Sequence, residues 1–173
     1  MPIENLRFLY LPNSSPKEVE IVAQDTKTGE ILGQVQAKAE ELKGYGGEKI
    51  PQPYINPDKS TTYRKVAKPH MYVEDLFVEK NVRHQGIGSK LLGKIAQESL
   101  NRGYKGRVML VAYNAYDVLP HKFYGKLGFI AGDKYINTQI EEAISTNFPL
   151  RNAKQTIMAL TSGGIKKLLK LIR

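Results

Sequence analysis

The sequence predicts a single mixed α+β domain, and three observations support this. First, two β-forming runs, residues 19–24 and 31–37, flank a glycine-bearing connection at 25–30, which is typical of an antiparallel hairpin. Second, an apolar run at residues 71–78 leads into a glycine-rich loop and then a helical period. Third, 173 residues with 41% hydrophobic and 25% charged side chains match a globular domain with a substantial core.

The remaining regular elements follow from their apolar periods. Residues 3–11 are expected to form a first strand, and residues 107–113 a buried one. Residues 88–101 are expected to form an amphipathic helix. Its apolar stripe consists of Leu91, Leu92, Ile95, Ala96 and Leu100.

Composition excludes several classes of protein. The chain has no cysteine, so disulfides, thiolate metal sites and a cysteine nucleophile are ruled out. Three scattered histidines form no recognisable metal-binding spacing, and no metal is expected. No apolar run is long enough to span a bilayer and the N-terminus has no signal pattern, so a cytoplasmic protein is expected. The formal charge of +9 favours a polyanionic ligand or partner.

The loop after the 71–78 run has the features of an anion-binding site. Residues 83–92 read Arg-His-Gln-Gly-Ile-Gly-Ser-Lys-Leu-Leu, and a helix opens inside them. Converging backbone N–H groups and the positive end of a helix dipole favour a phosphate. Leu91 stands where the dinucleotide fingerprint needs glycine, and no Gly-Lys-Ser/Thr follows, so neither common nucleotide motif is met.

A second motif lies about one helix and one strand downstream. Residues 121–129 read His-Lys-Phe-Tyr-Gly-Lys-Leu-Gly-Phe. Together with Arg-x-x-Gly-x-Gly after a Glu-Asp-Leu-Phe-Val strand, this segment resembles the GNAT-type N-acetyltransferase superfamily, best over residues 19–130. The resemblance implies a mostly antiparallel twisted sheet with splayed strands flanked by helices. Only about seven residues separate the first two strands, so the family's two N-terminal helices are expected to be reduced.

The resemblance implies where acetyl-CoA binds. Pantetheine would bond, as an added strand would, to the backbone of Leu76, Phe77 and Val78. The pyrophosphate would be surrounded, mostly through main-chain N–H groups, by Arg83, His84, Gln85, Gly86, Ile87, Gly88 and Ser89. Asn114 is expected to bond the pantetheine amides, and Lys126 either pairs with a cofactor phosphate or merely coats its helix.

Two residues are candidates for acid–base chemistry. A lysine-like amine is only about one part in 10³ neutral at pH 7, so the reaction gains from a base and from an acid for the departing thiolate. Glu74 is the candidate base by resemblance to diamine acetyltransferases, against a plain ion-paired glutamate. Asp75 is the weaker candidate, because strand alternation would turn it to the opposite face. Tyr124 is the candidate acid by resemblance, and Phe123 is expected to lie in the core.

Three segments have no assigned role. Residues 44–69 are loop-like and form either an acceptor loop or a mobile excursion. The insertion at 133–155 contains a brief helix at 139–144. Residues 163–173 form a basic amphipathic tail that docks on the domain or a second subunit, lies on an anionic membrane or nucleic acid, or frays.

The leading hypothesis is transfer of acetyl from acetyl-CoA to a primary amine, directly, within a ternary complex. The alternative is a non-catalytic CoA-binding or nucleic-acid-associated module with the same fold. The amine acceptor is not identified by the sequence, and a homodimer, nucleic acid or anionic membrane stays open as a partner.

Overall fold

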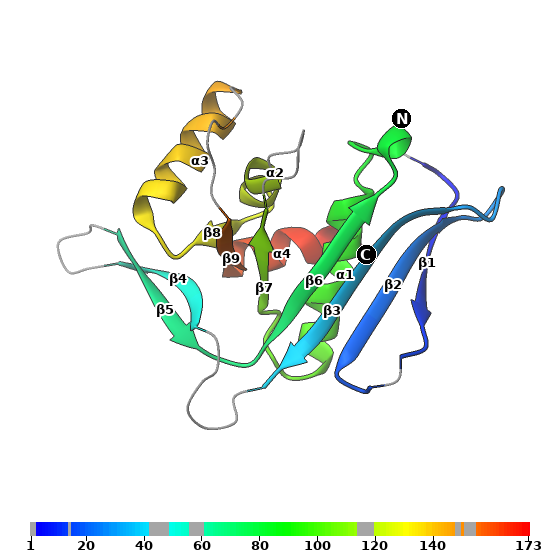
Figure 1. Ribbon diagram of the computed structural model, residues 1–173, viewed down its shortest axis with the longest axis horizontal. Coiled ribbons are helices and arrows are strands. Elements are labelled where there is room, and N and C mark those ends of the chain that lie inside the picture. Colours follow the sequence, from blue (N-terminus) through cyan, green and yellow to red (C-terminus); the bar gives the residue numbers. More distant parts are fainter. Residues whose placement is uncertain are drawn as a thin grey trace.

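The computed structural model describes residues 3–13, 15–41, 49–55, 61–113, 120–147, 150 and 155–173 (Figure 1). Nine strands lie in these ranges: β1 (Leu6–Leu11), β2 (Glu18–Asp25), β3 (Ile31–Glu40), β4 (Lys49–Ile55), β5 (Thr61–Ala67), β6 (His70–Val78), β7 (Val108–Ala112), β8 (Phe129–Ala131) and β9 (Thr156–Leu160). The helices in the same ranges are a 3-10 turn η1 (Lys80–Val82) and α1 (Ile87–Asn101), α2 (Pro120–Lys126), α3 (Lys134–Thr146) and α4 (Ser162–Leu171). Among these described helices, none has the length and apolar character needed to cross a bilayer.

Seven strands form one sheet in the order β1-β2-β3-β6-β7-β9-β8. All neighbouring pairs are antiparallel except β6 and β7, which run parallel because α1 connects them as a crossover. The predicted hairpin is present, with Gly29 at φ 78° in its turn. The predicted fold class, a mixed α+β domain with a mostly antiparallel sheet, is confirmed.

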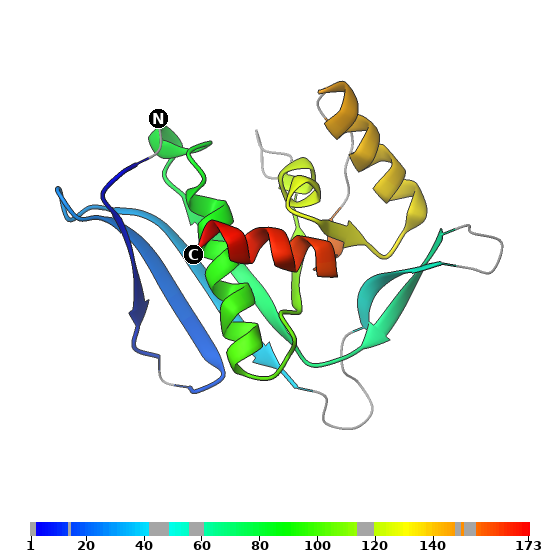
Figure 2. The same cartoon turned by 180° about the vertical axis from the view of Figure 1, so that it is seen from behind.

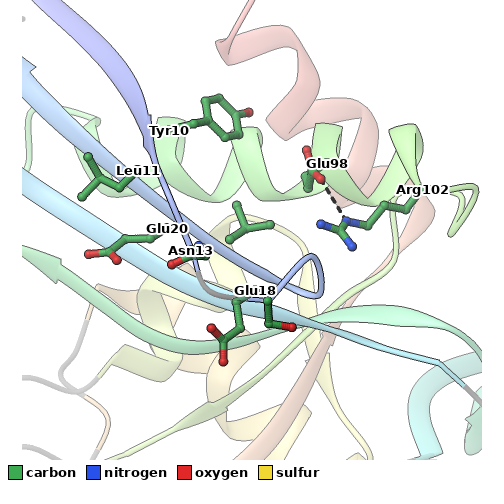
Figure 3. A pocket seen from close by; sticks show the side chains of 9 residues that line it. Tyr10, Leu11, Asn13, Glu18, Glu20, Glu98 and Arg102 are labelled. Carbon is green, nitrogen blue, oxygen red and sulfur yellow. Dashed lines mark hydrogen bonds and ion pairs between the residues drawn. The ribbon is translucent and has the colours of Figure 1, made fainter.

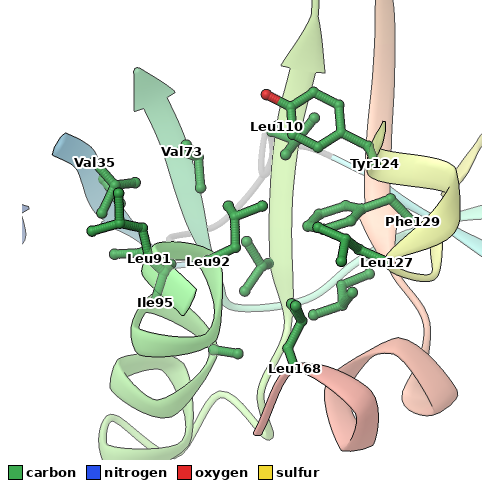
Figure 4. Packing of buried hydrophobic residues seen from close by; sticks show 14 of the residues in the cluster. Val35, Val73, Leu91, Leu92, Ile95, Leu110, Tyr124, Leu127, Phe129 and Leu168 are labelled. Carbon is green, nitrogen blue, oxygen red and sulfur yellow. The ribbon is translucent and has the colours of Figure 1, made fainter. Parts of the chain in front are cut away.

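One face of this sheet is covered by α1 and α4, which lie in front of the strands when the molecule is seen from behind (Figure 2). The helix predicted at 88–101 is confirmed, and its predicted stripe is buried except for Leu100. Figure 4 shows Leu91, Leu92 and Ile95 of α1 meeting side chains of the sheet in the core.

The C-terminal segment is a structural helix of the domain, which decides between the interpretations left open for it. The α4 side chain of Leu168 is 0% exposed and belongs to the main core. A Cβ at Gly93 of α1 would lie 2.9 Å from the carbonyl oxygen of Leu168, so the two helices cross at nearly the closest distance that glycine permits. The N-terminal end of α4 is capped by Thr161, whose Oγ1 accepts a bond of 3.1 Å from the Gly164 amide. The segment is therefore not a detachable tail.

The segment 44–69 is not a plain loop. Its described parts, β4 and β5, pair as an antiparallel hairpin that lies against β9 and β8 (Figure 1). The prolines suggested a loop, but β4 is an edge strand of a two-stranded sheet, where proline is tolerated. The expectation of an acceptor role for this segment stays untested.

The helix in the 133–155 insertion is longer than predicted, since α3 spans Lys134–Thr146. Asp133 caps its N-terminus by accepting bonds of 2.7 and 3.2 Å from the amides of Tyr135 and Ile136. The buried Ile140 and Ala143 anchor the helix to the domain. Aspartate in an N-cap position was the signal that could have predicted the earlier start.

The opposite face of β2, β3 and β6 carries no covering helix among the described residues. The connection from β1 to β2 spans only residues 12–17, so the expected reduction of the N-terminal helices is observed. In Figure 1 this face of β2, β3 and β6 is turned toward the viewer, with α1 behind it. We call it the open face of the sheet.

Candidate functional site

The site lies where β6 and β7 diverge. The two strands pair only through Met71–Val73 and Val108–Leu110. Beyond these pairs, β6 continues to Val78 while bonded only to β3, and β7 continues to Ala112 while bonded only to β9. The facing edges therefore leave main-chain groups without a strand partner among the described residues, and an extended amide-containing chain could bond there.

We call the gap between the diverging edges of β6 and β7 the slot. An anion-binding loop lies at its end. The N-cap of α1 is Gly86, at φ 82°, and His84 is also left-handed at φ 64°. The first amide bonded within the helix is that of Lys90, which donates to the Gly86 carbonyl. The amides of the first turn before it are free of helical partners, as at any helix start, and no acidic residue lies in that turn. The loop therefore presents N–H groups and partial positive charge to an anion.

Arg83 connects this loop to the end of β6. Its Nε donates a bond of 2.9 Å to the carbonyl of Val78, which ties the loop back to the strand. This bond uses one of the two lone pairs of the Val78 carbonyl oxygen, so that oxygen can still accept a second bond.

Gly33 on β3 is a site-forming residue that the sequence reasoning missed. A Cβ at this position would lie 3.0 Å from the Phe77 carbonyl oxygen and 3.1 Å from Cγ2 of Ile87. Glycine therefore lets the start of α1 approach the sheet beside the slot. The available signal was an isolated glycine within a strand pattern, which often marks a close backbone approach.

Tyr124 of α2 brings a buried phenol to the slot. The residue is 9% exposed, and its ring packs on Phe123 and Phe129 with centroids 5.3 and 5.7 Å away. In Figure 4 the hydroxyl points away from Phe129 and Leu127, toward β7 and β6. Burial, and to a lesser extent the negative charge of Asp75, raises the pKa of Tyr124 from 10.0 to about 12. The hydroxyl therefore keeps its proton at neutral pH.

Phe123 was predicted to lie in the core, and this prediction is wrong. Its side chain is 37% exposed, and its Cζ lies 3.3 Å from where a Cβ at Gly88 would be. The ring therefore stands between α2 and the first turn of α1. The helix α2 buries only the face that carries His121 and Tyr124, so the neighbouring Phe123 lies at the edge of that buried face.

A β-bulge in β6 brings both carboxylates to the open face. Val73 pairs with Ala37, but Asp75 pairs with Gln36, so Glu74 is an extra residue in the ladder. Val73 and Leu76 both contact the core, and the two residues between them are exposed. The expectation that Asp75 points opposite to Glu74 is therefore wrong, because it assumed regular alternation.

Glu74 forms an exposed ion pair. Its Oε1 lies 3.5 Å from Nζ of Lys38, which also lies 3.2 Å from Oε1 of Glu40. Such exposed pairs contribute about 0–1 kcal/mol, so this contact would yield readily to a bound cation. The observation fits the ion-pair interpretation of Glu74 and leaves its carboxylate accessible for the base role.

Two further cofactor residues were expected, Asn114 and Lys126. Asn114 lies outside the described residues. Lys126 is exposed at the end of α2, and its backbone carbonyl accepts a bond of 2.6 Å from Nζ of Lys167 on α4. In the described part of the chain, no three acidic or histidine side chains are grouped to hold a metal ion.

A surface depression of about 230 Å³ lies away from the slot, between the β1–β2 end and the last turns of α1 (Figure 3). In it, Nε of Arg102 lies 2.9 Å from Glu98, and Nη2 donates to the Pro16 carbonyl at 2.9 Å. These contacts hold the β1–β2 connection against α1. The polar side chains Glu98 and Arg102 in this depression are therefore explained by their structural role.

Comparison with known proteins identifies the family. The model of the acetyltransferase (GNAT) family matches residues 4–129. The chain belongs to this family. The resemblance inferred from the two motifs is thereby confirmed.

Individual relatives of this GNAT chain are distant. A thialysine N-epsilon-acetyltransferase of Mus musculus is 30% identical over 73 residues, which are 42% of this chain and 43% of the relative. A Bacillus anthracis structure described as a candidate streptothricin acetyltransferase, solved with acetyl coenzyme A, is 19% identical with a TM-score of 0.49. It aligns with 85% of this chain and 64% of that one. The KacTA–DNA complex is 14% identical with a TM-score of 0.50, covering 91% and 76% of the two chains, and this likeness concerns the fold alone.

Proposed function

We propose that this chain transfers the acetyl group of acetyl-CoA to a primary amine, directly and within a ternary complex, in the slot between β6 and β7. The observation that carries the proposal is the meeting of three features at one place. These are the unpaired strand edges, the uncapped first turn of α1, and the buried hydroxyl of Tyr124. The chain has no cysteine, so a cysteinyl acetyl-enzyme is excluded, which favours direct transfer.

Each part of the cofactor has a complementary surface. Pantetheine would run along β6 and bond to the backbone of Leu76, Phe77 and Val78. The pyrophosphate would lie on the amides of residues 83–89, where Gly86 leaves the approach open, since a Cβ there would have no atom within 4 Å. Asn114 and Lys126 remain proposed contacts to the pantetheine and to a phosphate.

The reaction would then proceed through two proton movements. The neutral amine attacks the thioester carbonyl carbon, which forms the C–N bond and a tetrahedral intermediate. The carboxylate of Glu74, directly or through a water, takes the proton that the nitrogen loses. The C–S bond breaks, and the Tyr124 hydroxyl donates its proton to the departing thiolate. The raised pKa of Tyr124 ensures that this proton is present at neutral pH.

The test is release of the CoA thiol from acetyl-CoA in the presence of a panel of amines, with calorimetric binding of acetyl-CoA measured in parallel. Amine-dependent thiol release together with an acetylated product supports the proposal. Binding of acetyl-CoA without transfer to any amine would instead support the non-catalytic module.

A further inference from the structure

We propose that two copies of this chain pair through β1, edge to edge and antiparallel, so that their seven-stranded sheets join into one across a two-fold axis. The partner is a second copy of the same chain, because the edge of β1 is complementary to itself in its hydrogen-bonding groups and in its charges. The proposal concerns assembly and does not depend on the acetyl transfer proposed above.

The strand β1 is an open edge of the sheet, at the right of Figure 1. Among the described residues it pairs with β2 alone, in a continuous antiparallel register along its whole length. The edge strand at the other end of the sheet, β8, is only three residues long and lies against α3 and the β4–β5 hairpin. The sheet therefore has one long edge that no described strand extends.

The residues of β1 lack the features that protect a sheet edge. The strand reads Leu-Arg-Phe-Leu-Tyr-Leu, with no proline, glycine, lysine or carboxylate. Exposed edges usually carry such residues or a bulge, because a regular apolar edge strand readily pairs with another strand. Tyr10 is 53% exposed and Leu11 is 37% exposed, although both side chains are large and apolar. The edge therefore offers apolar side chains as well as main-chain groups.

One hydrogen bond shows which main-chain groups of β1 point outward. The amide of Thr26 donates a bond of 2.7 Å to the carbonyl of Asn5, and these two residues continue the register of β1 with β2. Hydrogen-bonded and non-hydrogen-bonded pairs alternate along an antiparallel ladder. Every second residue from Asn5 therefore bonds to β2, and the residues between them direct their amides and carbonyls outward. These residues are Leu6, Phe8 and Tyr10.

The charges favour one register between the two copies. If Phe8 lies opposite Tyr10 of the second copy, the outward groups of both residues bond across the axis, and Arg7 lies opposite Leu11. Leu11 pairs with Glu20 of β2, so Arg7 of one copy and Glu20 of the other would lie on one face, two inter-strand distances or about 10 Å apart. An extended arginine and an extended glutamate can together span that distance.

Both charged side chains can make this contact. Nε of Arg7 donates a bond of 2.8 Å to Gln24, and the guanidinium forms no ion pair among the described residues. Glu20 accepts a bond of 2.7 Å from Gln34 through one oxygen, which leaves the other oxygen for a cation. The contact occurs twice across the axis, which offsets part of the repulsion between two chains of net charge +9. Because each chain has one such edge, the pairing closes at two copies.

Sedimentation equilibrium measures this assembly. The mass of the unaltered protein should rise from 19.5 kDa toward twice that value between about 1 µM and about 1 mM, since a small interface gives a weak dimer. Leu11→Lys places a lysine opposite Arg7 on both sides of the axis, so the dissociation constant of the dimer should rise about tenfold. Arg7→Glu/Leu11→Lys turns both contacts into glutamate–lysine pairs and should return the constant to within about threefold of its original value.

A matched control adds the same charge to an interior strand. Ile157 is 36% exposed, close to the 37% of Leu11, but it lies on β9 between β7 and β8. Ile157→Lys should therefore leave the dissociation constant unchanged. Thermal unfolding of every variant checks that each is folded.

Amide hydrogen exchange locates the contact within β1. The amides of Phe8 and Tyr10 point outward, so they should exchange about fivefold more slowly at ten times the dissociation constant than in dilute protein, where the monomer dominates. The amides of Leu9 and Leu11 bond to β2 and should be protected at both concentrations.

Each other outcome would overturn the proposal. One is a mass that stays at 19.5 kDa up to about 1 mM, and another is a mass that rises beyond two copies. A dimer in which Phe8 and Tyr10 exchange as fast as in the monomer would have its interface elsewhere. The same holds for a dimer that Ile157→Lys weakens as much as Leu11→Lys does. None of these outcomes bears on acetyl transfer, so the two proposals fail separately.

Discussion

The burial of Tyr124 can be tested through the pH dependence of folding. The pKa of its hydroxyl is about 12 in the folded protein and 10.0 without that environment. Below about pH 10 the phenol is protonated in both states, and its contribution to stability is fully present. As the pH rises from about 10 to about 12, the unfolded chain loses the proton first, so the free energy of unfolding falls.

The size of this effect follows from the shift. At 1.36 kcal/mol per pKa unit, the folded state should lose about 1.4 kcal/mol from this group between about pH 9 and about pH 11. The Tyr124→Phe variant lacks the group, so its stability should fall by that much less over the same interval. Urea unfolding at both pH values gives the comparison. Tyr135→Phe, at a side chain 72% exposed, is the control. If the free energy of unfolding falls equally with pH for the unaltered protein and for Tyr124→Phe, the inference that the Tyr124 hydroxyl is buried would be refuted.

The same variant tests the proposed chemistry. Loss of a general acid costs about 10²–10⁴-fold in kcat, while the KM for acetyl-CoA should change little because the hydroxyl acts as the thiolate leaves. Turnover close to that of the unaltered protein, on an acceptor for which chemistry is rate-limiting, would reduce Tyr124 to a packing residue.

Three further predictions concern binding, catalysis and stability. Gly86→Val should abolish acetyl-CoA binding in calorimetry, whereas Gly103→Val, also at positive φ with open space around it, should share the backbone strain and keep the affinity. Glu74→Gln should lower kcat/KM about 10²–10⁴-fold at neutral pH and less at alkaline pH, where more acceptor is already neutral; an equal loss at every pH would argue against a base. Leu168→Ala should destabilise the protein by about 2–5 kcal/mol in urea unfolding, and Leu171→Ala, at an exposed position, by under about 0.5; equal effects would contradict the docking of α4 on α1.

The pattern of apolar residues and glycines along the sequence was enough to predict the parts of the site that are formed by consecutive residues. The β6 strand, the loop at 83–89 and α1 are consecutive in the chain, and glycines at the helix start carry their own conformational signal. The predicted cofactor and catalytic roles of these residues stay predictions, since they concern binding and chemistry rather than fold.

Features that depend on pairing between distant segments could not be predicted. The bulge at Glu74 exists only relative to β3, so alternation within β6 gave the wrong direction for Asp75. Likewise the apolar stripe of the last residues showed that they must dock, but the place depends on Gly93, about 75 residues earlier along the chain. The β4–β5 hairpin was hidden because prolines in an edge strand look like loop residues.

The short junction between β6 and β7 has a mechanical consequence. Only three residue pairs join the four-stranded half of the sheet, β1-β2-β3-β6, to the three-stranded half, β7-β9-β8. Among the described residues, the halves are also held together by α1 and α4 packed across the back, by the β4–β5 hairpin against β9 and β8, and by a bond of 2.7 Å from Nε of Arg107 to the Pro69 carbonyl. The two halves of the sheet can therefore move relative to each other about this junction. A molecule hydrogen-bonded to both inner edges would supply the inter-strand hydrogen bonds that β6 and β7 do not make there. Amide hydrogen exchange in residues 74–78 should then slow when the slot is filled, even though no atom of the fold needs to move far.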